Sequence, residues 1–122
     1  MKVLVTGAGG FIGSRLSKRL ISEGHDVYGT FHESPSQVEG IQIINADFTN
    51  EDFEIPDVNF DVVFHLAAAT PLTKDKKKQK KINYEGAVNL FNKIKEKTGF
   101  IIYVSGLGVF GNPKGIVNEQ SP

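Results

Sequence analysis

The chain has 122 residues, which suits one domain with a single core. Lys plus Arg and Asp plus Glu number 14 each, so the formal net charge of zero gives no reason to expect nucleic acid as a partner. The hydrophobic share of 39% is too high for a disordered chain, and the absence of cysteine excludes disulfides and thiolate metal sites. We therefore expect a cytoplasmic protein with no metal and, since no apolar run could span a bilayer, no membrane partner.

Five short apolar runs, rich in β-branched residues, are typical of buried strands. In chain order they are residues 2–6, 26–31, 41–45, 61–66 and 100–104. Between the third and fourth runs, residues 49–59 are acidic and contain a proline, which predicts a loop with a short helical turn. Alternation of such runs with helical segments indicates a parallel sheet covered by helices.

Two segments have the periodicity of helices. In the first, Ile12, Leu16 and Leu20 repeat every four residues, and Gly24 is placed to end the helix. The second covers residues 82–97. Its expected apolar face consists of Ala87, Val88, Phe91 and Ile94.

A lysine-rich stretch, residues 74–81, precedes the second helix. Such a run can bind nucleic acid or an acidic partner. The net charge is zero and no aromatic residues interleave with the lysines as a stacking platform requires, so we expect a solvated loop and helix start.

Three glycines spaced three residues apart separate the first strand from the first helix. Gly7 would permit a tight turn, Gly10 would let a pyrophosphate approach the backbone, and Gly13 would let the helix lie close to the strand. The free N–H groups and the dipole of the helix N-terminus favour phosphate, although a purely structural turn is the alternative. The residues predicted to contact a dinucleotide here are Gly7, Gly9, Gly10, Phe11, Ile12 and Gly13.

The opening segment, MKVLVTGAGGFIGSRL, resembles that of extended short-chain dehydrogenases/reductases, the NAD-dependent sugar epimerase/dehydratase group. Its Thr6, Gly7, Gly10 and Gly13 match the fingerprint Thr-Gly-x-x-Gly-x-x-Gly. Four further segments resemble family segments in order and spacing: residues 45–48, 64–68, 82–90 and 103–111. The resemblance implies an α/β fold over residues 1–122, a three-layer Rossmann-type doubly wound parallel sheet of about five strands in the order 3-2-1-4-5.

The resemblance also implies cofactor contacts beyond the glycines. Asp47 would accept a hydrogen bond from the adenine amino group, beside the backbone of Phe48, or would instead cap a loop at the strand end. Small residues after the fourth strand would line the cofactor ribose, or would simply pack there. They are Leu66, Ala67 and Ala68.

Two further polar residues of these motifs have open roles. His65 lies within an apolar strand, and we expect a satisfied core histidine rather than a base. Asn83, near the expected helix start, would hold the backbone close to the active site or would cap the helix.

The choice of cofactor depends on the end of the second strand. NAD-preferring members have an acid there that binds the ribose hydroxyls, but this chain has Phe31, followed by His32. Asp26 lies at the wrong end of the strand, and Glu33 lies two residues late. An uncharged site near His32, with Arg15 as a further candidate, would repel a 2′-phosphate less. The cofactor is therefore predicted as NADP or NAD, with a slight preference for NADP.

The family's reaction needs a Tyr-x-x-x-Lys pair on one helix face, in which the lysine lowers the pKa of the tyrosine. The residues four positions after Tyr28, Tyr84 and Tyr103 are His32, Val88 and Leu107. The serine that orients the substrate hydroxyl falls at Gly106, which leaves Ser105 as the candidate catalytic residue. We expect an incomplete domain, cut before the catalytic helix and the substrate domain.

Three functions remain open at this stage. The chain is the cofactor-binding part of an epimerase, dehydratase or reductase, or a non-catalytic dinucleotide sensor, or a scaffold that binds nothing tightly. The expected partners are a dinucleotide and, only in an intact parent, a small-molecule substrate such as a nucleotide sugar or a related hydroxyl or carbonyl compound. The helix at residues 82–97 resembles one that builds the family's homodimer.

Overall fold

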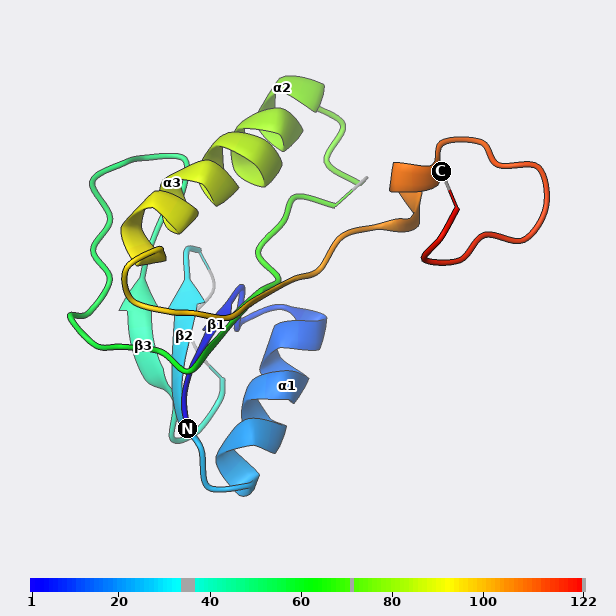
Figure 1. Ribbon diagram of the computed structural model, residues 1–122. Coiled ribbons are helices and arrows are strands. Elements are labelled where there is room, and N and C mark those ends of the chain that lie inside the picture. Colours follow the sequence, from blue (N-terminus) through cyan, green and yellow to red (C-terminus); the bar gives the residue numbers. More distant parts are fainter. Residues whose placement is uncertain (34–36, 71, 122) are drawn as a thin grey trace.

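Five parallel strands form one sheet between two layers of helices (Figure 1). The computed structural model describes residues 1–33, 37–70 and 72–121. The strands are β1 (Lys2–Thr6), β2 (Asp26–Phe31), β3 (Gln42–Asn45), β4 (Val62–His65) and β5 (Ile101–Tyr103). They lie in the order β3-β2-β1-β4-β5, which confirms the predicted Rossmann-type α/β fold.

The strand order reverses between β1 and β4. From β1 the chain crosses to β2 through helix α1 (Phe11–Ser22) on one face of the sheet. From β4 it crosses to β5 on the other face through α2 (Lys76–Lys80), the π-helical turn η1 (Lys81–Glu85) and α3 (Gly86–Ile94). In sheets of this kind, ligands bind beyond the carboxyl ends of the strands at such a reversal.

The predicted strands agree with the observed ones to within one residue at each end. β1 and β2 have the predicted bounds, and β3, β4 and β5 are each shorter by one or two residues. The expected short helical turn in residues 49–59 is absent from this described segment, which forms turns and coil instead.

The core consists of two apolar clusters, one on each face of the sheet. Because side chains alternate along a strand, Leu4 packs into one cluster while Val3 and Val5 pack into the other. All three side chains are completely buried. The sequence of β1 therefore fixes it as the central strand that separates the two clusters.

Helix α1 packs on the sheet largely through its predicted apolar side, because Leu20 is buried and Leu16 packs against the same core cluster, but Ile12 departs from the prediction. Gly13, Ser17 and Leu20 are buried, whereas Ile12, expected on the apolar face, is 60% exposed. The reason is the close approach at Gly13, where an added Cβ would lie 2.2 Å from the carbonyl oxygen of Gly7. As predicted, the helix ends before Gly24, which has a φ of 84°.

The predicted second helix, residues 82–97, is wrong at both ends. The helical segment starts at Lys76, where the Asp75 carboxylate accepts hydrogen bonds from the amides of Lys77 (2.9 Å) and Lys78 (3.1 Å). Most of the lysine run is therefore helical rather than loop, and α3 ends at Ile94.

The buried face of α3 also differs from the prediction. Val88 is 42% exposed, and Leu90 is fully buried in its place. Gly86 sets this orientation, because its Cα faces Phe48 so closely that an added Cβ would lie 3.2 Å from the Phe48 Cβ.

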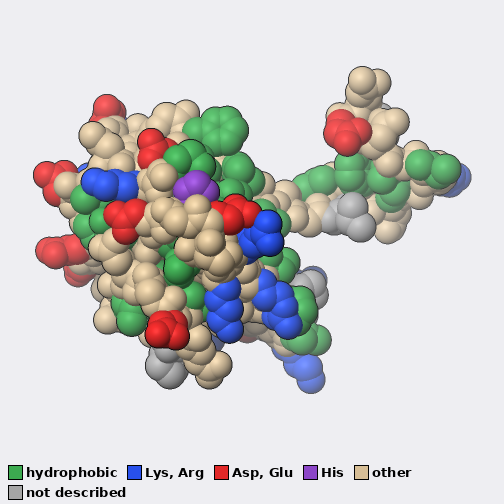
Figure 2. All heavy atoms as spheres, turned by 90° about the horizontal axis from the view of Figure 1, so that it is seen from below, with side chains coloured by type: hydrophobic (Ala, Val, Ile, Leu, Met, Phe, Trp, Pro, Cys, Tyr) green, Lys and Arg blue, Asp and Glu red, His purple; other side chains and the backbone are tan. Residues whose placement is uncertain are grey.

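Beyond β5 the chain leaves the sheet as an arm that includes a short 3₁₀ turn, η2 (Leu107–Phe110) (Figures 1 and 2). On the face drawn in Figure 2, acidic and basic side chains both occur among hydrophobic ones. In the described part of the chain, no helix is long and apolar enough to cross a membrane.

Candidate functional site

A cavity of about 740 Å³ lies where the strand order reverses. Its lining comes from the end of β2 and from the segments that follow β1, β2, β3 and β4, and the helical segment at residues 78–82 adds three more residues. This volume is in the range of small-molecule and cofactor sites.

The cavity brings together most of the residues that the sequence singled out. Those that line it are Gly7, Gly10, Phe31, His32, Asp47, Phe48, Leu66, Ala67 and Ala68. Those that do not are Gly9, Phe11, Ile12, Gly13, Asn83 and Ser105. Ser105 is exposed and follows the edge strand β5, so the candidate catalytic serine lies outside the cavity lining.

The glycine loop presents backbone amides at the start of α1. Gly7 has a φ of 66°, and its carbonyl accepts a hydrogen bond from the Gly10 amide at 3.0 Å. The first bond of the helix runs from the Ser14 amide to the Gly10 carbonyl at 2.9 Å. Among the described residues, the amides at 11–13 therefore have no acceptor, and the helix dipole adds positive potential there.

Gly13 and Gly10 are required for different reasons. A Cβ at Gly13 would lie 2.2 Å from the Gly7 carbonyl oxygen, so the fold itself requires glycine there. A Cβ at Gly10 would meet only that same oxygen, at 3.3 Å, and Gly10 lines the cavity. This contact with a backbone oxygen is tight but far less severe than the one at Gly13, and a ligand lying against the backbone would be a second reason for glycine at position 10.

Thr6 holds the segment after β4 in place. Its hydroxyl oxygen accepts hydrogen bonds from the amides of Leu66 (3.0 Å) and Ala67 (3.1 Å) and lies 2.8 Å from His65 Nδ1. With both lone pairs used, the hydroxyl donates its proton to Nδ1, so the imidazole is neutral and carries its proton on Nε2. Burial lowers the pKa of His65 from 6.5 to about 4. The prediction of a satisfied core histidine is confirmed.

Asn83 holds the next part of the same segment. Its side-chain oxygen accepts a hydrogen bond from the Ala69 amide at 2.7 Å, and its side-chain nitrogen donates to the Ala69 carbonyl at 3.1 Å. Asn83 lies inside the π-helical turn η1, so it is no helix cap. Of the two roles left open by the sequence, it has the first, that of positioning the backbone beside the cavity.

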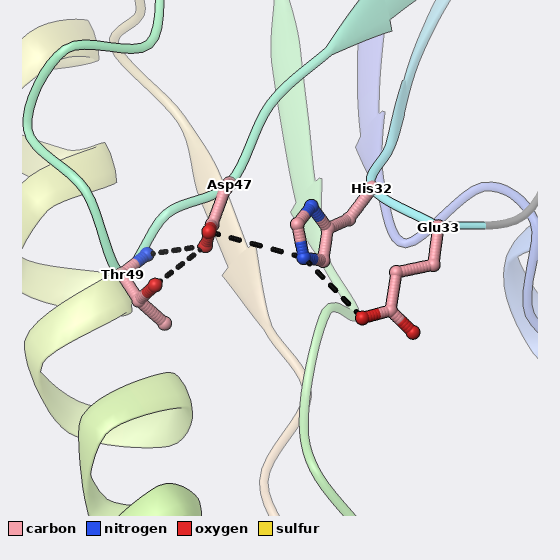
Figure 3. A network of polar contacts seen from close by, with 4 residues as sticks. All are labelled: His32, Glu33, Asp47 and Thr49. Carbon is pink, nitrogen blue, oxygen red and sulfur yellow. Dashed lines mark hydrogen bonds and ion pairs between the residues drawn. The ribbon is translucent and has the colours of Figure 1, made fainter.

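Acidic side chains and one histidine meet at the ends of β2 and β3 (Figure 3). The Asp47 carboxylate accepts hydrogen bonds from the amide (3.0 Å) and the hydroxyl (2.7 Å) of Thr49. The Thr49 hydroxyl bond is the largest cause of a lowered pKa of Asp47, and the charges of His32 and Lys81 add to it. Asp47 therefore caps the loop after β3, which is one of the two roles predicted for it. It also lines the cavity.

Arg15 does not reach this site. Its guanidinium lies 3.8 Å from the centre of the Phe11 ring and donates to the Phe11 carbonyl at 3.1 Å. Sequence reasoning named it as a candidate for a 2′-phosphate, but the structure turns it back onto its own helix.

The sequence missed several residues of the site. Lys78 and Lys81 are exposed, as expected, but the sequence did not reveal that both line the cavity. Asn89 donates to the Phe48 carbonyl at 2.8 Å and so fixes the loop after β3. The capping aspartate before the lysine run could have revealed the first two, because it places Lys78 and Lys81 three residues apart on one helical face.

Comparison with known proteins gives consistent matches. A family model described as NAD dependent epimerase/dehydratase family matches residues 3–122. The chain is 31% identical over 124 residues to 2-alkyl-3-oxoalkanoate reductase from Shewanella oneidensis, a match that covers 97% of this chain and 32% of that protein. It is 37% identical over 79 residues to UDP-glucose 4-epimerase from Mycolicibacterium smegmatis, covering 56% of this chain and 25% of the relative.

Solved structures share the whole fold of the chain. UDP-glucose 4-epimerase from Bifidobacterium longum, in complex with NAD+ and UDP, has a TM-score of 0.86 at 26% identity, covering 100% of this chain and 42% of that one. UDP-glucuronic acid 4-epimerase from Bacillus cereus, in complex with NAD, has a TM-score of 0.76 at 30% identity. This match covers 98% of this chain and 44% of that one. The chain thus spans less than half the length of the proteins it matches.

Proposed function

The chain belongs to the NAD dependent epimerase/dehydratase family, and from that premise we propose that residues 1–122 form a domain whose cavity binds NAD or NADP. The observation that carries the proposal is the set of amides at residues 11–13, which have no acceptor among the described residues and lie beside the cavity-lining Gly10. Such a helix N-terminus favours the negative charge of a pyrophosphate.

The other cavity residues suit the remaining parts of a dinucleotide. The carboxylate of Asp47 is held in place by Thr49 and can accept a hydrogen bond from an adenine amino group. Leu66, Ala67 and Ala68 present small side chains and backbone to a ribose, on a segment that Thr6 and Asn83 hold. When bound, the cofactor would supply a nicotinamide ring that gives or takes a hydride.

We propose that the parent activity is that of an epimerase, dehydratase or reductase acting on a nucleotide sugar or a related hydroxyl or carbonyl compound. The relatives support this class, since they include a UDP-glucose 4-epimerase and a 2-alkyl-3-oxoalkanoate reductase. The 122 residues contain no Tyr-x-x-x-Lys pair, so proton transfer coupled to the hydride would need residues beyond them. On its own the chain would bind the cofactor without completing the reaction, and Ser105 is its one candidate for a catalytic role.

A second function, non-catalytic sensing of the dinucleotide, is favoured by one observation. The position that carries the family's substrate-orienting serine is Gly106, which has no side-chain donor. A natural protein that ends at Pro122 and still binds the cofactor would support sensing. Continuation of the natural sequence into a Tyr-x-x-x-Lys segment would support the enzyme.

We also propose a homodimer through the helical segment that follows the lysine run. Tyr84 is 63% exposed and Val88 is 42% exposed, and their spacing of four residues places them on the same helical face. The proposed partners are thus the dinucleotide, a second copy of the chain and, in a longer parent, the substrate. The proposed location is the cytoplasm, which a cysteine-free sequence suits.

Calorimetric titration with NAD and NADP tests cofactor binding, with Gly10→Val as the diagnostic variant. A side chain at position 10 would occupy the space of the pyrophosphate while meeting only one backbone oxygen. We expect the wild-type chain to bind and to gain thermal stability with cofactor, and Gly10→Val to lose both effects while remaining folded.

Gly99→Val is the matched control, because a Cβ at Gly99 would meet nothing within 4 Å and Gly99 does not line the cavity. It should bind as the wild type does. If folded Gly10→Val bound the cofactor as tightly as the wild type, the proposed pyrophosphate position would be refuted. If the wild type bound neither cofactor at millimolar concentration, the only function left would be that of a scaffold that binds nothing tightly.

A further inference from the structure

Two lysines of the helical segment after β4 line the cavity. They are Lys78, in α2, and Lys81, the first residue of η1. Both are exposed, and neither belongs to a segment through which the chain resembles the family, the nearest of which begins at Ile82. Their place beside the cavity is therefore a feature of this chain that the family motifs do not explain.

One capping side chain decides which lysines face the cavity. The Asp75 carboxylate accepts hydrogen bonds from the amides of Lys77 (2.9 Å) and Lys78 (3.1 Å), which fixes the start of the helix. Residues three positions apart lie on the same helical face, so this start brings Lys78 and Lys81 to the cavity together. The lysines of α2 that do not line the cavity are Lys76, Lys77 and Lys80.

Neither of the two cavity-lining ammonium groups has an ionic partner in the part of the chain that the structure describes. Within that part, the one lysine in an ion pair is Lys97, with Asp57. The charge of Lys81 helps to lower the pKa of Asp47, after the larger effect of the Thr49 hydroxyl, but the two residues form no ion pair. An ammonium group has three hydrogen-bond donors and no acceptor, so two of them on one wall of a cavity suit an anionic ligand.

We propose that Lys78 and Lys81 form an anion-binding wall that contacts the diphosphate of the bound dinucleotide on the side facing away from α1. The inference rests on the proposed function and adds two phosphate-binding residues to it. The diphosphate is the anionic part that NAD and NADP share. The amides of residues 11–13 and the dipole of α1 hold one side of it, and the two ammonium groups neutralise the charge on the other.

The test compares two double variants that remove the same charge from the same helical segment. Lys78→Gln/Lys81→Gln changes the anion-binding wall, and Lys77→Gln/Lys80→Gln changes two exposed lysines that do not line the cavity. The ligand is whichever of NAD+ and NADP+ the wild type binds more tightly, titrated by calorimetry. We expect the first variant to bind roughly tenfold more weakly than the wild type, and the second to bind as the wild type does.

Salt separates a loss of charge from a change of shape. Salt screens exposed charges, so the deficit of Lys78→Gln/Lys81→Gln should shrink when NaCl is raised from about 50 mM to about 500 mM. A second measurement needs no variant. Saturating cofactor should protect Lys78 and Lys81 from acetylation by acetic anhydride, detected by mass spectrometry, and should leave Lys77 and Lys80 as reactive as in the free chain.

The inference is overturned if the two double variants bind the cofactor equally, if the deficit does not depend on salt, or if the cofactor protects none of the four lysines. It alone fails if Gly10→Val abolishes binding while Lys78→Gln/Lys81→Gln binds as the wild type does. If the wild type binds neither NAD+ nor NADP+, the proposed function itself fails, and the inference fails with it.

Discussion

The two ends of the cavity are held in different ways. At the proposed phosphate end, the loop after β1 and the segment after β4 are fixed by close backbone packing and by hydrogen bonds to largely buried side chains such as Thr6. At the proposed adenosine end, the side chains of His32 and Glu33 are 56% and 81% exposed, and the ion-pair contacts of His32 with Glu33 and Asp47 are longer than 3.5 Å.

This difference separates what the fold requires from what the ligand requires. At the proposed phosphate end, groups that the fold itself uses, such as Gly13 and Thr6, carry stability, so substitutions of these two residues should destabilise the protein. The exposed groups at the proposed adenosine end contribute little to stability, because exposed ion pairs are worth little, so substitutions of these groups should leave stability unchanged. The predictions below test this contrast, from the largest expected effect on stability to none.

The largest loss is expected for Gly13→Ala. The added methyl group would lie 2.2 Å from the Gly7 carbonyl oxygen, and backbone cannot move aside as a flexible side chain can. We expect a loss of at least about 3 kcal/mol in the free energy of unfolding, measured by urea denaturation. Gly99→Ala is the control, because a Cβ at Gly99 would have no atom within 4 Å. Equal stability of the two variants would contradict the close packing of α1 on the glycine loop.

A comparable loss is expected on acidification, through His65. Its pKa in the folded chain is about 4, below the ordinary value of 6.5, so the unfolded chain binds more protons between these values. Stability is therefore full above pH 6.5 and falls as the pH drops toward 4, by about 3 kcal/mol. Urea denaturation between pH 7 and 4.5 would measure it.

His65→Gln removes the titrating group and should flatten this pH dependence. His32→Gln, which changes an exposed histidine, should leave it unchanged. The assignment would be wrong if the wild-type stability were flat across this range, or if His65→Gln kept the slope.

A smaller loss is expected for Thr6→Val. The substitution keeps the shape of the side chain but removes the oxygen that serves two amides and one imidazole. We expect a loss of about 2 kcal/mol, because polar groups at a buried site are left without partners. Thr6→Ser keeps the oxygen and should stay close to the wild type in the same denaturation measurement, and a fully stable Thr6→Val would contradict the role of Thr6.

No measurable loss of stability is expected for Glu33→Gln, a variant at the opposite end of the cavity. Its contact with His32 is exposed, and the loop after β3 at the same end is held by Thr49 and Asn89 instead. Unfolding curves that overlay those of the wild type would sharpen the contrast between the two ends. A clear destabilisation would show that the adenosine end also supports the fold.

The same contrast explains what the sequence could predict. β1 and β2 have the expected bounds because buried parallel strands are continuous apolar runs, and the strand–glycine–helix order that suggested a phosphate site is present as predicted. The helical lysine run was missed because it has no apolar periodicity, and its start depends on a single capping side chain, Asp75. The exposure of Ile12 and Val88 goes with two close glycine contacts, Gly13 with Gly7 and Gly86 with Phe48, which periodicity cannot reveal.

At the proposed adenosine end, candidate residues could be named from the sequence, but their geometry could not be predicted. Nothing in the spacing showed that Phe31 enters the core, that Arg15 stacks on Phe11, or that Glu33 lines the cavity. Exposed side chains leave no periodic signal, so their arrangement follows only from the tertiary structure.

The most direct measurement is a titration of the ¹⁵N-labelled chain with NAD, followed by the backbone amide signals. If the diphosphate lies at the start of α1, the amides of residues 9–13 should show the largest saturable shifts, and Gly10→Val should abolish them. Saturable shifts elsewhere, with these amides unmoved, would show that a dinucleotide binds but not against this helix, and the central claim would be wrong.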